Sequence, residues 1–170
     1  MRHTFQTAQW VPYPIERVFA FFANPENLPR LMPEWQRARI ESSHLTAPVP
    51  PAPDSKPAGL AAGAGSRMTI SFQALPFLPI RMRWEAEIVE FEWDRHFCDE
   101  QPKGPFAYWR HCHWVSNERR DFSIGTKVLD HLVYELPLGI VSEPAHFLFV
   151  RRQIREIFAY RQRRLLELLS

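Results

Sequence analysis

Apolar and charged residues alternate strictly along residues 81–88, and this alternation is the clearest pattern in the chain. The apolar positions are Met82, Trp84, Ala86 and Ile88. Because successive side chains of a strand point to opposite faces, the pattern predicts a strand of an antiparallel sheet with one buried face. Looser alternation and turn residues predict further strands over residues 3–11, 35–46, 66–74, 97–101, 106–113 and 128–134.

Helical spacing follows the first strand and returns at the end of the chain. Pro14 suits the first turn of a helix, and the apolar stripe after it comprises Ile15, Val18, Phe19 and Phe22. Asn24 and Pro25 are typical of the N-cap and first position of a second short helix, which Pro33 ends. Apolar residues at helical spacing, interleaved with arginines, predict one long amphipathic helix over residues 142–169, about 40 Å in length.

The order of these elements predicts an α+β fold in one domain over residues 1–170. Short connections between strands require antiparallel hairpins, and one face of such a sheet must be covered. The C-terminal helix is long enough to do so, and we expect a strongly curved sheet of about seven strands wrapped round it, with a space between them. Residues 47–65, rich in Pro, Ala and Gly, predict a flexible surface loop.

Composition and charge narrow the function classes. The chain contains 13 Phe and 6 Trp, which suit a large core or a roomy apolar cavity. A formal net charge of +2 is not typical of nucleic-acid-binding proteins, so we expect no nucleic-acid partner. The chain has no apolar run of about 18 residues, and its first residues lead directly into a strand pattern. We therefore expect neither a membrane span nor a signal peptide, and predict a cytoplasmic protein.

The two cysteines, Cys98 and Cys112, show no CxxC spacing. In the reducing compartment that we predict, free thiols on the outer face of the sheet are the expected state. Antiparallel pairing of residues 97–101 with residues 106–113 would nevertheless bring the two cysteines opposite each other.

Polar residues gather on one face of the predicted strands around residues 97–113. Side chains two positions apart share a face. The residues with this parity are Asp99, Gln101, Trp109, His111 and His113, together with Asp130 and Tyr134 on the last strand. The opposite face carries Cys98, Glu100, Arg110, Cys112 and Trp114. The charged Glu100 and Arg110 favour placing the histidines inside.

Four interpretations of this polar face are open. Asp99, His111 and Asp130 can satisfy one another as a structural cluster. The same groups can line a pocket floor and orient a mostly apolar ligand. General acid–base catalysis would use His111 or His113, oriented by Asp99 or Asp130. A metal site is the weakest interpretation, because two imidazoles supply two ligands and a third must be assumed. We therefore expect no metal and no cofactor.

Several segments resemble the START-like, polyketide-cyclase-like superfamily of helix-grip proteins (SRPBCC). They are PIERVF at 14–19, NPENL at 24–28, FxDxQ at 97–101, GPFxxWxHxH at 104–113, DxxVYxxPxG at 130–139 and the arginine-rich closing helix. The segments from residue 97 onward resemble one bacterial subgroup, which occurs alone or joined to a nucleotide-sugar-epimerase-like domain. The resemblance implies a curved sheet that grips the C-terminal helix. It covers almost the whole chain but does not extend to residues 47–65, which look like an insertion.

The wider family includes lipid carriers, quinone-binding proteins, aromatase/cyclases and hormone sensors. We therefore predict binding of a small hydrophobic or amphipathic molecule, of lipid, polyketide-like, aromatic or quinone type, in an internal cavity. The predicted ligand-binding residues are Met82, Trp84, Phe97, Asp99, Gln101, Trp109, His111, His113, Asp130, Tyr134, Phe147 and Ile154. Phe22, Leu31, Phe147 and Ile154 are expected to close the entrance or the roof of the cavity.

Two alternatives to simple binding stay open. One is a cyclase, dehydratase or isomerase that uses a cavity histidine as general acid or base. The other is a partner domain for an epimerase-like protein, which predicts an exposed apolar patch and no usable cavity. Contact of the basic C-terminal helix with a membrane is a less favoured interpretation than a solvated arginine face.

Overall fold

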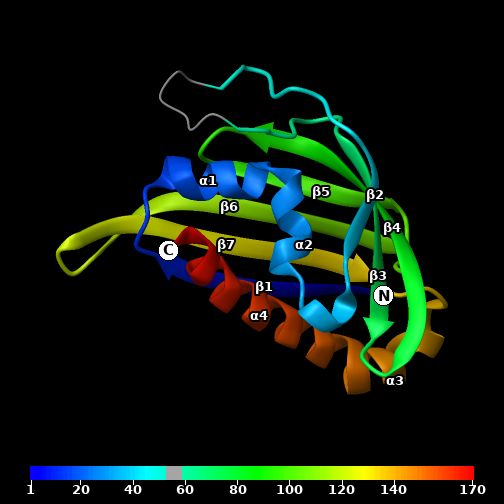
Figure 1. Ribbon diagram of the computed structural model, residues 1–170. Coiled ribbons are helices and arrows are strands. Elements are labelled where there is room, and N and C mark those ends of the chain that lie inside the picture. The colour runs from blue at the N-terminus through cyan, green and yellow to red at the C-terminus, as the bar shows by residue number, and fades with distance from the viewer. Residues whose placement is uncertain (53–58) are drawn as a thin grey trace.

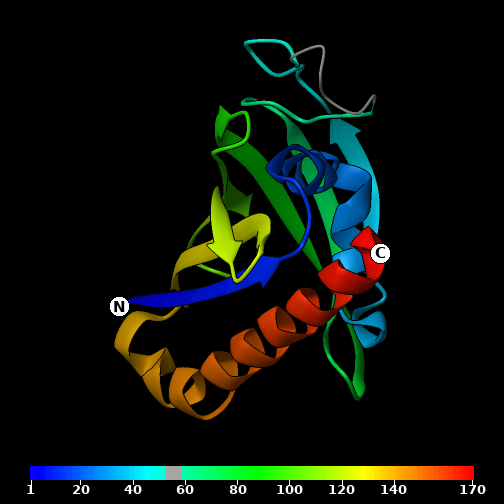
Figure 2. The same cartoon turned by 90° about the vertical axis from the view of Figure 1, so that its left-hand side faces the viewer.

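Seven antiparallel strands form one sheet in the order β1-β7-β6-β5-β4-β3-β2. The computed structural model describes residues 1–52 and 59–170 (Figure 1). The strands are β1 (Arg2–Val11), β2 (Arg39–His44), β3 (Arg67–Leu75), β4 (Leu78–Glu92), β5 (His96–Lys103), β6 (Tyr108–Arg120) and β7 (Ser123–Glu135). The sheet is strongly curved and the helices lie on its concave side (Figures 1 and 2). The predicted α+β helix-grip architecture is confirmed.

Two short helices follow β1, as predicted, and helical turns lead into the last helix. In chain order they are α1 (Ile15–Ala23), a 3₁₀ turn (Pro25–Asn27), α2 (Leu28–Leu31), a 3₁₀ turn (Glu34–Gln36), a 3₁₀ turn (Gly139–Ser142), α3 (Glu143–Ala145), a π-helical turn (His146–Val150) and α4 (Arg151–Leu169). The Glu26 backbone N–H donates to Asn24 Oδ1 at 3.0 Å, which confirms the predicted N-cap. Among the described residues, no helix is both long and apolar enough to cross a membrane.

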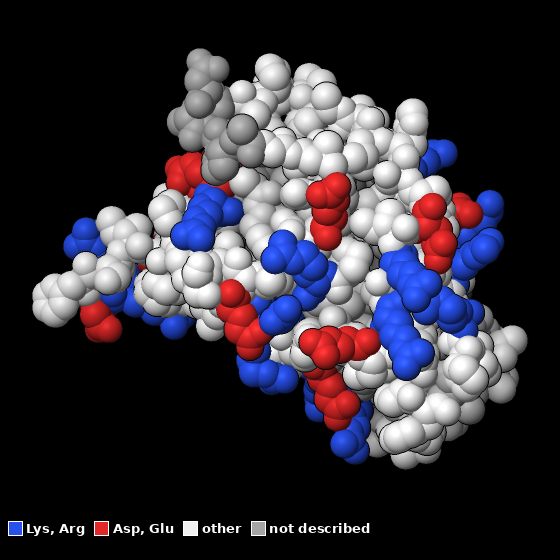
Figure 3. All heavy atoms as spheres, in the orientation of Figure 1, with Lys and Arg blue, Asp and Glu red and all other residues white. Residues whose placement is uncertain are grey.

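α4 crosses the open side of the sheet and buries an apolar stripe beneath it (Figure 2). The buried residues are Ile154, Phe158, Leu165 and Leu169. On the outward face, Arg152 pairs with Glu156 at 2.7 Å and Arg164 pairs with Glu167 at 2.7 Å. Acidic side chains therefore lie among the basic ones on the surface (Figure 3). The apolar stripe and the solvated arginine face match the sequence analysis.

The chain just before α4 differs from the prediction of one continuous helix from residue 142. Residues 139–150 form 3₁₀, α and π-helical turns in succession, and α4 begins only at Arg151. A π-helical turn adds a residue, which rotates the neighbouring side chains by about 100° relative to a regular helix. Phe147 is consequently 70% exposed and does not form part of a cavity roof, contrary to expectation. The corner of the surface around α3 is mostly uncharged (Figure 3).

The tract predicted as a flexible loop, residues 47–65, is packed at its C-terminal end. Its residues 53–58 lie outside the described part of the chain. Ala62 is 1% exposed, and its backbone N–H donates to the carbonyl oxygen of Ala23 at 2.9 Å. The Gly65 N–H donates to the carbonyl oxygen of Ile88 at 2.8 Å. This end of the tract is therefore tied to α1 and β4 by backbone hydrogen bonds, which a hydrophobicity pattern does not reveal.

The register of β5, β6 and β7 aligns the polar residues as side-chain parity predicted. Asp99 lies opposite His111 across β5 and β6, and His113 lies opposite Asp130 across β6 and β7. Residues 115–125 lie between two strands predicted at 106–113 and 128–134, where the sequence predicts a turn. They are instead mostly strand, because β6 and β7 continue as a long hairpin beyond the helices. That hairpin end is largely solvent-exposed, so its sequence lacks the apolar alternation of a half-buried strand.

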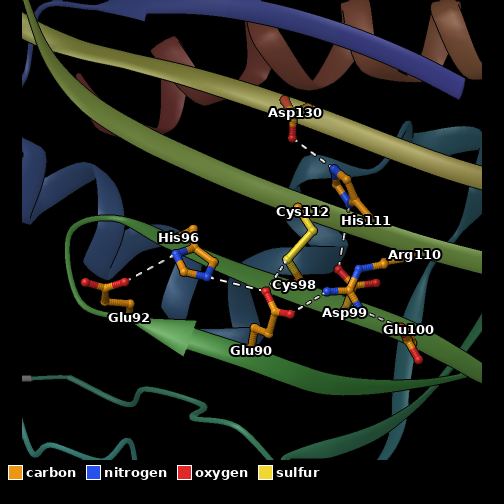
Figure 4. Close-up of a disulfide and its surroundings, with 10 residues drawn as sticks. All are labelled: Glu90, Glu92, His96, Cys98, Asp99, Glu100, Arg110, His111, Cys112 and Asp130. Carbon is orange, nitrogen blue, oxygen red and sulfur yellow. Dashed lines mark hydrogen bonds and ion pairs between the residues drawn. A yellow bond between two sulfur atoms is a disulfide. The ribbon is translucent and has the colours of Figure 1, made fainter.

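Cys98 and Cys112 form a disulfide on the convex face of the sheet (Figure 4). They lie directly opposite each other across β5 and β6, with their Cα atoms 4.1 Å apart. The prediction of free thiols is therefore wrong, because the register brings the two sulfur atoms within bonding distance. Disulfides are rare in reducing compartments, so this bond lends no support to the predicted cytoplasmic location, which stays a prediction.

We expect protein denatured without reductant to take up no alkylating reagent, and reduced protein to take up two equivalents, one for each cysteine. Intact mass before and after iodoacetamide treatment measures this. Because the disulfide closes a loop with a sequence separation of 14, reduction should lower the free energy of unfolding by about 3 kcal/mol. Two alkylated thiols in the unreduced protein would contradict the assignment.

Candidate functional site

An internal cavity of about 330 Å³ lies between the concave face of the sheet and the helices. Its side wall on β3 and β4 is apolar and comprises Met68, Ile70, Phe72, Met82, Trp84, Ala86 and Ile88. The helical elements close the other side with Phe22, Leu28, Leu31, Ile154 and Phe158. The alternating side chains of the strands and the apolar stripe of α4 thus point into one shared space.

The structure brings most of the predicted ligand-binding residues to the cavity wall. Those on the wall are Met82, Trp84, Phe97, Asp99, Trp109, His111, His113 and Ile154, together with the expected entrance residues Phe22 and Leu31. The predicted residues that do not line the cavity are Gln101, Asp130, Tyr134 and Phe147. The alternation of side chains along each strand placed these residues on the correct face of the sheet. It does not define how far the cavity extends along that face.

Gln101 and Tyr134 have structural partners away from the cavity. Gln101 Nε2 donates to the backbone oxygen of Phe106 at 2.9 Å, which closes the loop between β5 and β6. Tyr134 Oη lies 2.8 Å from His146 Nε2, near the end of β7. Tyr134 Oη and Gln101 Nε2 therefore have partners within the protein, whereas Gln101 Oε1 is buried without a hydrogen-bond partner among the described residues.

Sequence reasoning missed four residues of α4 that line the cavity, namely Gln153, Ile157, Phe158 and Arg161. Phe158 lies one turn after Ile154 on the same apolar stripe, and its position at helical spacing was the available signal. Arg161 also reaches the cavity wall, although it had been grouped with the solvated arginines. Its side chain lies over the Phe158 ring, 5.2 Å from the ring centroid. An arginine at the edge of an apolar stripe can reach inward along its own alkyl stem.

Asp130 on β7 supports two histidines of β6 from behind. Its Oδ1 atom lies 3.0 Å from His111 Nε2, in a hydrogen bond, and 2.8 Å from His113 Nδ1. The second contact has an ion-pair distance but lacks the direction of a hydrogen bond. All three side chains are buried, and of the three only the histidines line the cavity. Asp130 therefore orients both imidazoles without contacting the cavity itself.

Asp99 on β5 approaches His111 from the other side. Its Oδ1 atom lies 3.7 Å from His111 Nδ1, so the His111 ring lies between the carboxylates of Asp99 and Asp130 (Figure 4). The Asp99 side chain is 19% exposed and lines the cavity. The polar floor of the cavity is thus built by three adjacent strands.

Burial and close neighbours set the protonation states of the cluster. Burial lowers the pKa of His111 to about 4 and also lowers the pKa of His113. Burial alone would raise the pKa of Asp130, but the electrostatic contact with His113 and the hydrogen bond from His111 hold that pKa well below its usual value. Burial raises the pKa of Asp99. At neutral pH the cluster therefore contains neutral imidazoles beside an ionised Asp130.

Aromatic rings surround the polar cluster. The His113 ring packs against Phe22 at 5.0 Å and against Phe97 at 4.6 Å between centroids. Trp84 and Trp109 meet edge to face at 4.6 Å. Trp84 Nε1 is buried and has no hydrogen-bond partner among the described residues, so it offers a donor to a molecule in the cavity.

Two groups of described side chains bring three metal-ligating atoms within 4.8 Å of one another. One group is Asp99, His111 and His113 in the cavity. The other is His3, Glu143 and His146, where β1 meets the turns that precede α4. The expectation of no metal rested on a missing third ligand, and Asp99 supplies a candidate for that ligand.

We expect Asp130→Ala to lower the free energy of unfolding by about 3 kcal/mol, because it leaves His111 Nε2 and His113 Nδ1 buried without their carboxylate. Urea unfolding followed by circular dichroism measures the effect. The matched control is Glu100→Ala on the convex face, where Arg110 keeps its second partner Glu90 at 2.6 Å. That surface change should cost less than about 1 kcal/mol. Equal losses for the two variants would show that Asp130 has no special structural role.

Solved structures with the same architecture cover nearly the whole chain. TTHA0849 from Thermus thermophilus has a TM-score of 0.63 at 21% identity, covering 99% of this chain and 100% of that one. CV1439 from Chromobacterium violaceum has a TM-score of 0.62 at 12% identity, covering 98% and 96%. Ara h 8.0201 has a TM-score of 0.59 at 14% identity, covering 98% and 99%. At these identities the similarity shows the fold alone.

The sequence itself also matches a known family. No curated protein matches the chain. The family described as "Polyketide cyclase / dehydrase and lipid transport" matches residues 11–159, which run from the end of β1 into the first half of α4 and include every strand that builds the cavity. With its curved sheet, gripped helix and internal cavity, the chain belongs to the polyketide cyclase/dehydrase and lipid-transport family.

Proposed function

We propose that this protein binds a small hydrophobic or amphipathic molecule inside the cavity between the sheet and α4. The observation that carries the proposal is an apolar internal space of about 330 Å³. Ligand pockets commonly enclose about 300–1,000 Å³ and are lined mainly by apolar and aromatic side chains with a few placed polar groups. The size and lining of this cavity fit that description.

The distribution of polar groups supports a ligand with one polar end. The walls on β3 and β4 are apolar, and α4 adds apolar residues together with Gln153 and Arg161. Asp99, His111 and His113 gather on the floor. An apolar body would be stabilised by burial against the walls, at roughly 25 cal/mol per Å² removed from water. A polar end would find hydrogen-bonding partners on the floor. Lipid, polyketide-like, aromatic and quinone molecules all combine an apolar body with polar oxygen atoms.

Catalysis is a second candidate, and the support that Asp130 gives to both histidines favours it. A neutral imidazole held by a carboxylate is a suitable general base. Such an enzyme would act as a cyclase, dehydratase or isomerase on the bound molecule. In simple binding the ligand leaves the protein unchanged, whereas catalysis converts it into a product. Native mass spectrometry of the protein–ligand complex distinguishes the two by the mass of the bound molecule. The alternative of a partner domain for an epimerase-like protein predicts that there is no usable cavity. The cavity volume of about 330 Å³ argues against that alternative.

We expect the uncharged fluorescent probe N-phenylnaphthylamine to bind saturably to the purified protein, because its aromatic body fits an apolar cavity. Ala86→Phe should weaken that binding by at least about tenfold, since a ring on the β4 wall occupies cavity volume. Fluorescence titration measures both affinities. Native mass spectrometry of the untreated protein would in addition detect a ligand that co-purifies.

Ala159→Phe is the matched control, because Ala159 lies on the exposed face of α4 outside the cavity. This variant should bind the probe as the natural protein does. The proposal fails if the natural protein shows no saturable binding. It also fails if the two phenylalanine variants bind the probe equally well.

A further inference from the structure

The strands bring three metal-ligating side chains to one point on the cavity floor. His111 and His113 extend from β6, and Asp99 extends from β5, with one ligating atom of each within 4.8 Å of the others. Residues two apart on a strand supply only two ligands, and the third comes from the neighbouring strand through its register. We propose that Asp99, His111 and His113 bind a divalent first-row transition-metal ion.

The ring nitrogens of the histidines are arranged as in a metal site. His111 Nε2 and His113 Nδ1 both face Asp130 Oδ1, at 3.0 Å and 2.8 Å. An ionised carboxylate only accepts hydrogen bonds, so the nitrogens that face it carry the protons. The remaining nitrogens, His111 Nδ1 and His113 Nε2, then present lone pairs. Metal-ligating histidines almost always donate their other N–H to such an outer partner, and here Asp130 pairs with His111 in a hydrogen bond and lies at ion-pair distance from His113.

The distance between the ligating atoms of Asp99 and His111 is close to the distance that two ligands of one metal ion require. Zinc–nitrogen and zinc–oxygen bonds of about 2.1 Å place two tetrahedral ligands about 3.4 Å apart. Asp99 Oδ1 and His111 Nδ1 are separated by 3.7 Å. One ligating atom of each of the three residues lies within 4.8 Å of the others, so side-chain rotation would have to bring these atoms closer together around an ion. Two imidazoles and one carboxylate suit zinc, cobalt, iron or nickel, whereas calcium and magnesium prefer a shell of oxygen atoms.

A divalent ion would also balance the charge of the cluster. Asp99 and Asp130 place two carboxyl groups around histidines that are neutral when they ligate a metal. A buried carboxylate is costly unless a cation or hydrogen-bond donors lie beside it. Arg161 is the nearby positive side chain on α4, but no ion pair joins it to Asp99 among the described contacts. A bound dication would neutralise both carboxylates where they lie.

Three protein ligands leave at least one coordination position open. All three proposed ligands line the cavity, so the open position faces the space in which the organic molecule would lie. This is the pattern of metal sites that bind water or substrate, and structural sites are normally closed by four protein ligands. The inference deepens the proposed function and rests on it, because the ion would bind an oxygen atom at the polar end of that molecule.

The second group, His3, Glu143 and His146, provides an internal control. His146 Nε2 lies 2.8 Å from Tyr134 Oη, and the His3 and His146 rings stack with centroids 3.5 Å apart. His3 Nε2 is 3.2 Å from Glu143 Oε1, a direct contact between two of the candidate donors. No carboxylate orients this histidine pair as Asp130 orients the other, among the described contacts. We therefore assign metal binding to the cavity group.

The test is a titration of chelator-treated protein with Co²⁺. We expect one equivalent to bind and to give the visible absorption of cobalt with nitrogen and oxygen ligands, and Zn²⁺ to displace it while Ca²⁺ does not. Asp99→Asn and His113→Gln, which preserve side-chain size, should each weaken binding by more than about 100-fold. Asp130→Asn should weaken it by about 10- to 100-fold, as expected for an outer partner of the ligands. His146→Gln should leave the affinity unchanged.

Paramagnetic broadening by Co²⁺ of the His111 and His113 ring resonances tests the same assignment in the natural protein, in case a variant fails to fold. The inference is overturned if Co²⁺ does not bind, if only His146→Gln abolishes binding, or if the broadened resonances are those of His3 and His146. N-phenylnaphthylamine binding is measured separately on metal-free protein. Probe binding without metal binding would therefore refute this inference and leave the proposed function intact.

Discussion

The antiparallel register of β5, β6 and β7 is the constraint on which both faces of the sheet depend. It places Asp99 opposite His111 and His113 opposite Asp130 on the concave face. The same register places Cys98 opposite Cys112 on the convex face, where they form the disulfide. Because side chains alternate with a period of two, a slip by one residue would move the polar cluster outward and the cysteines inward. The disulfide therefore locks the register that assembles the cavity floor.

The cavity floor keeps polar groups in a place where apolar packing would be more stable. A buried ion pair rarely stabilises a protein more than apolar side chains of the same shape, because removing its charges from water is costly. Here Asp130 is buried behind two histidines, and Asp99 faces the cavity beside them. That arrangement is understandable if the cluster serves a bound molecule or ion. It explains why buried histidines and a carboxylate are concentrated at one point of a cavity whose β3 and β4 walls are apolar.

α4 and the elements around it determine the volume of that space. The helix covers the sheet with Ile154 and Phe158, and Leu165 and Leu169 pack in the core beside α1 (Figures 1 and 2). α1 and α2 close the space with Phe22, Leu28 and Leu31, and the Phe22 ring packs against His113 on the floor. The irregular turns over residues 139–150 shorten α4 and leave Phe147 at the surface instead of inside.

Local pattern determined the elements, their order and the face of the sheet on which each polar residue lies. The alternation at Met82, Trp84 and Ala86 and the stripe through Ile154 follow directly from strand and helix periodicity, and both are confirmed. Contacts across the sheet and between layers depend on distances that periodicity does not contain. Tertiary structure therefore decided the Cys98–Cys112 bond, the inward reach of Arg161, the contact of Tyr134 with His146 and the position of Asp130 behind the histidines instead of on the cavity wall.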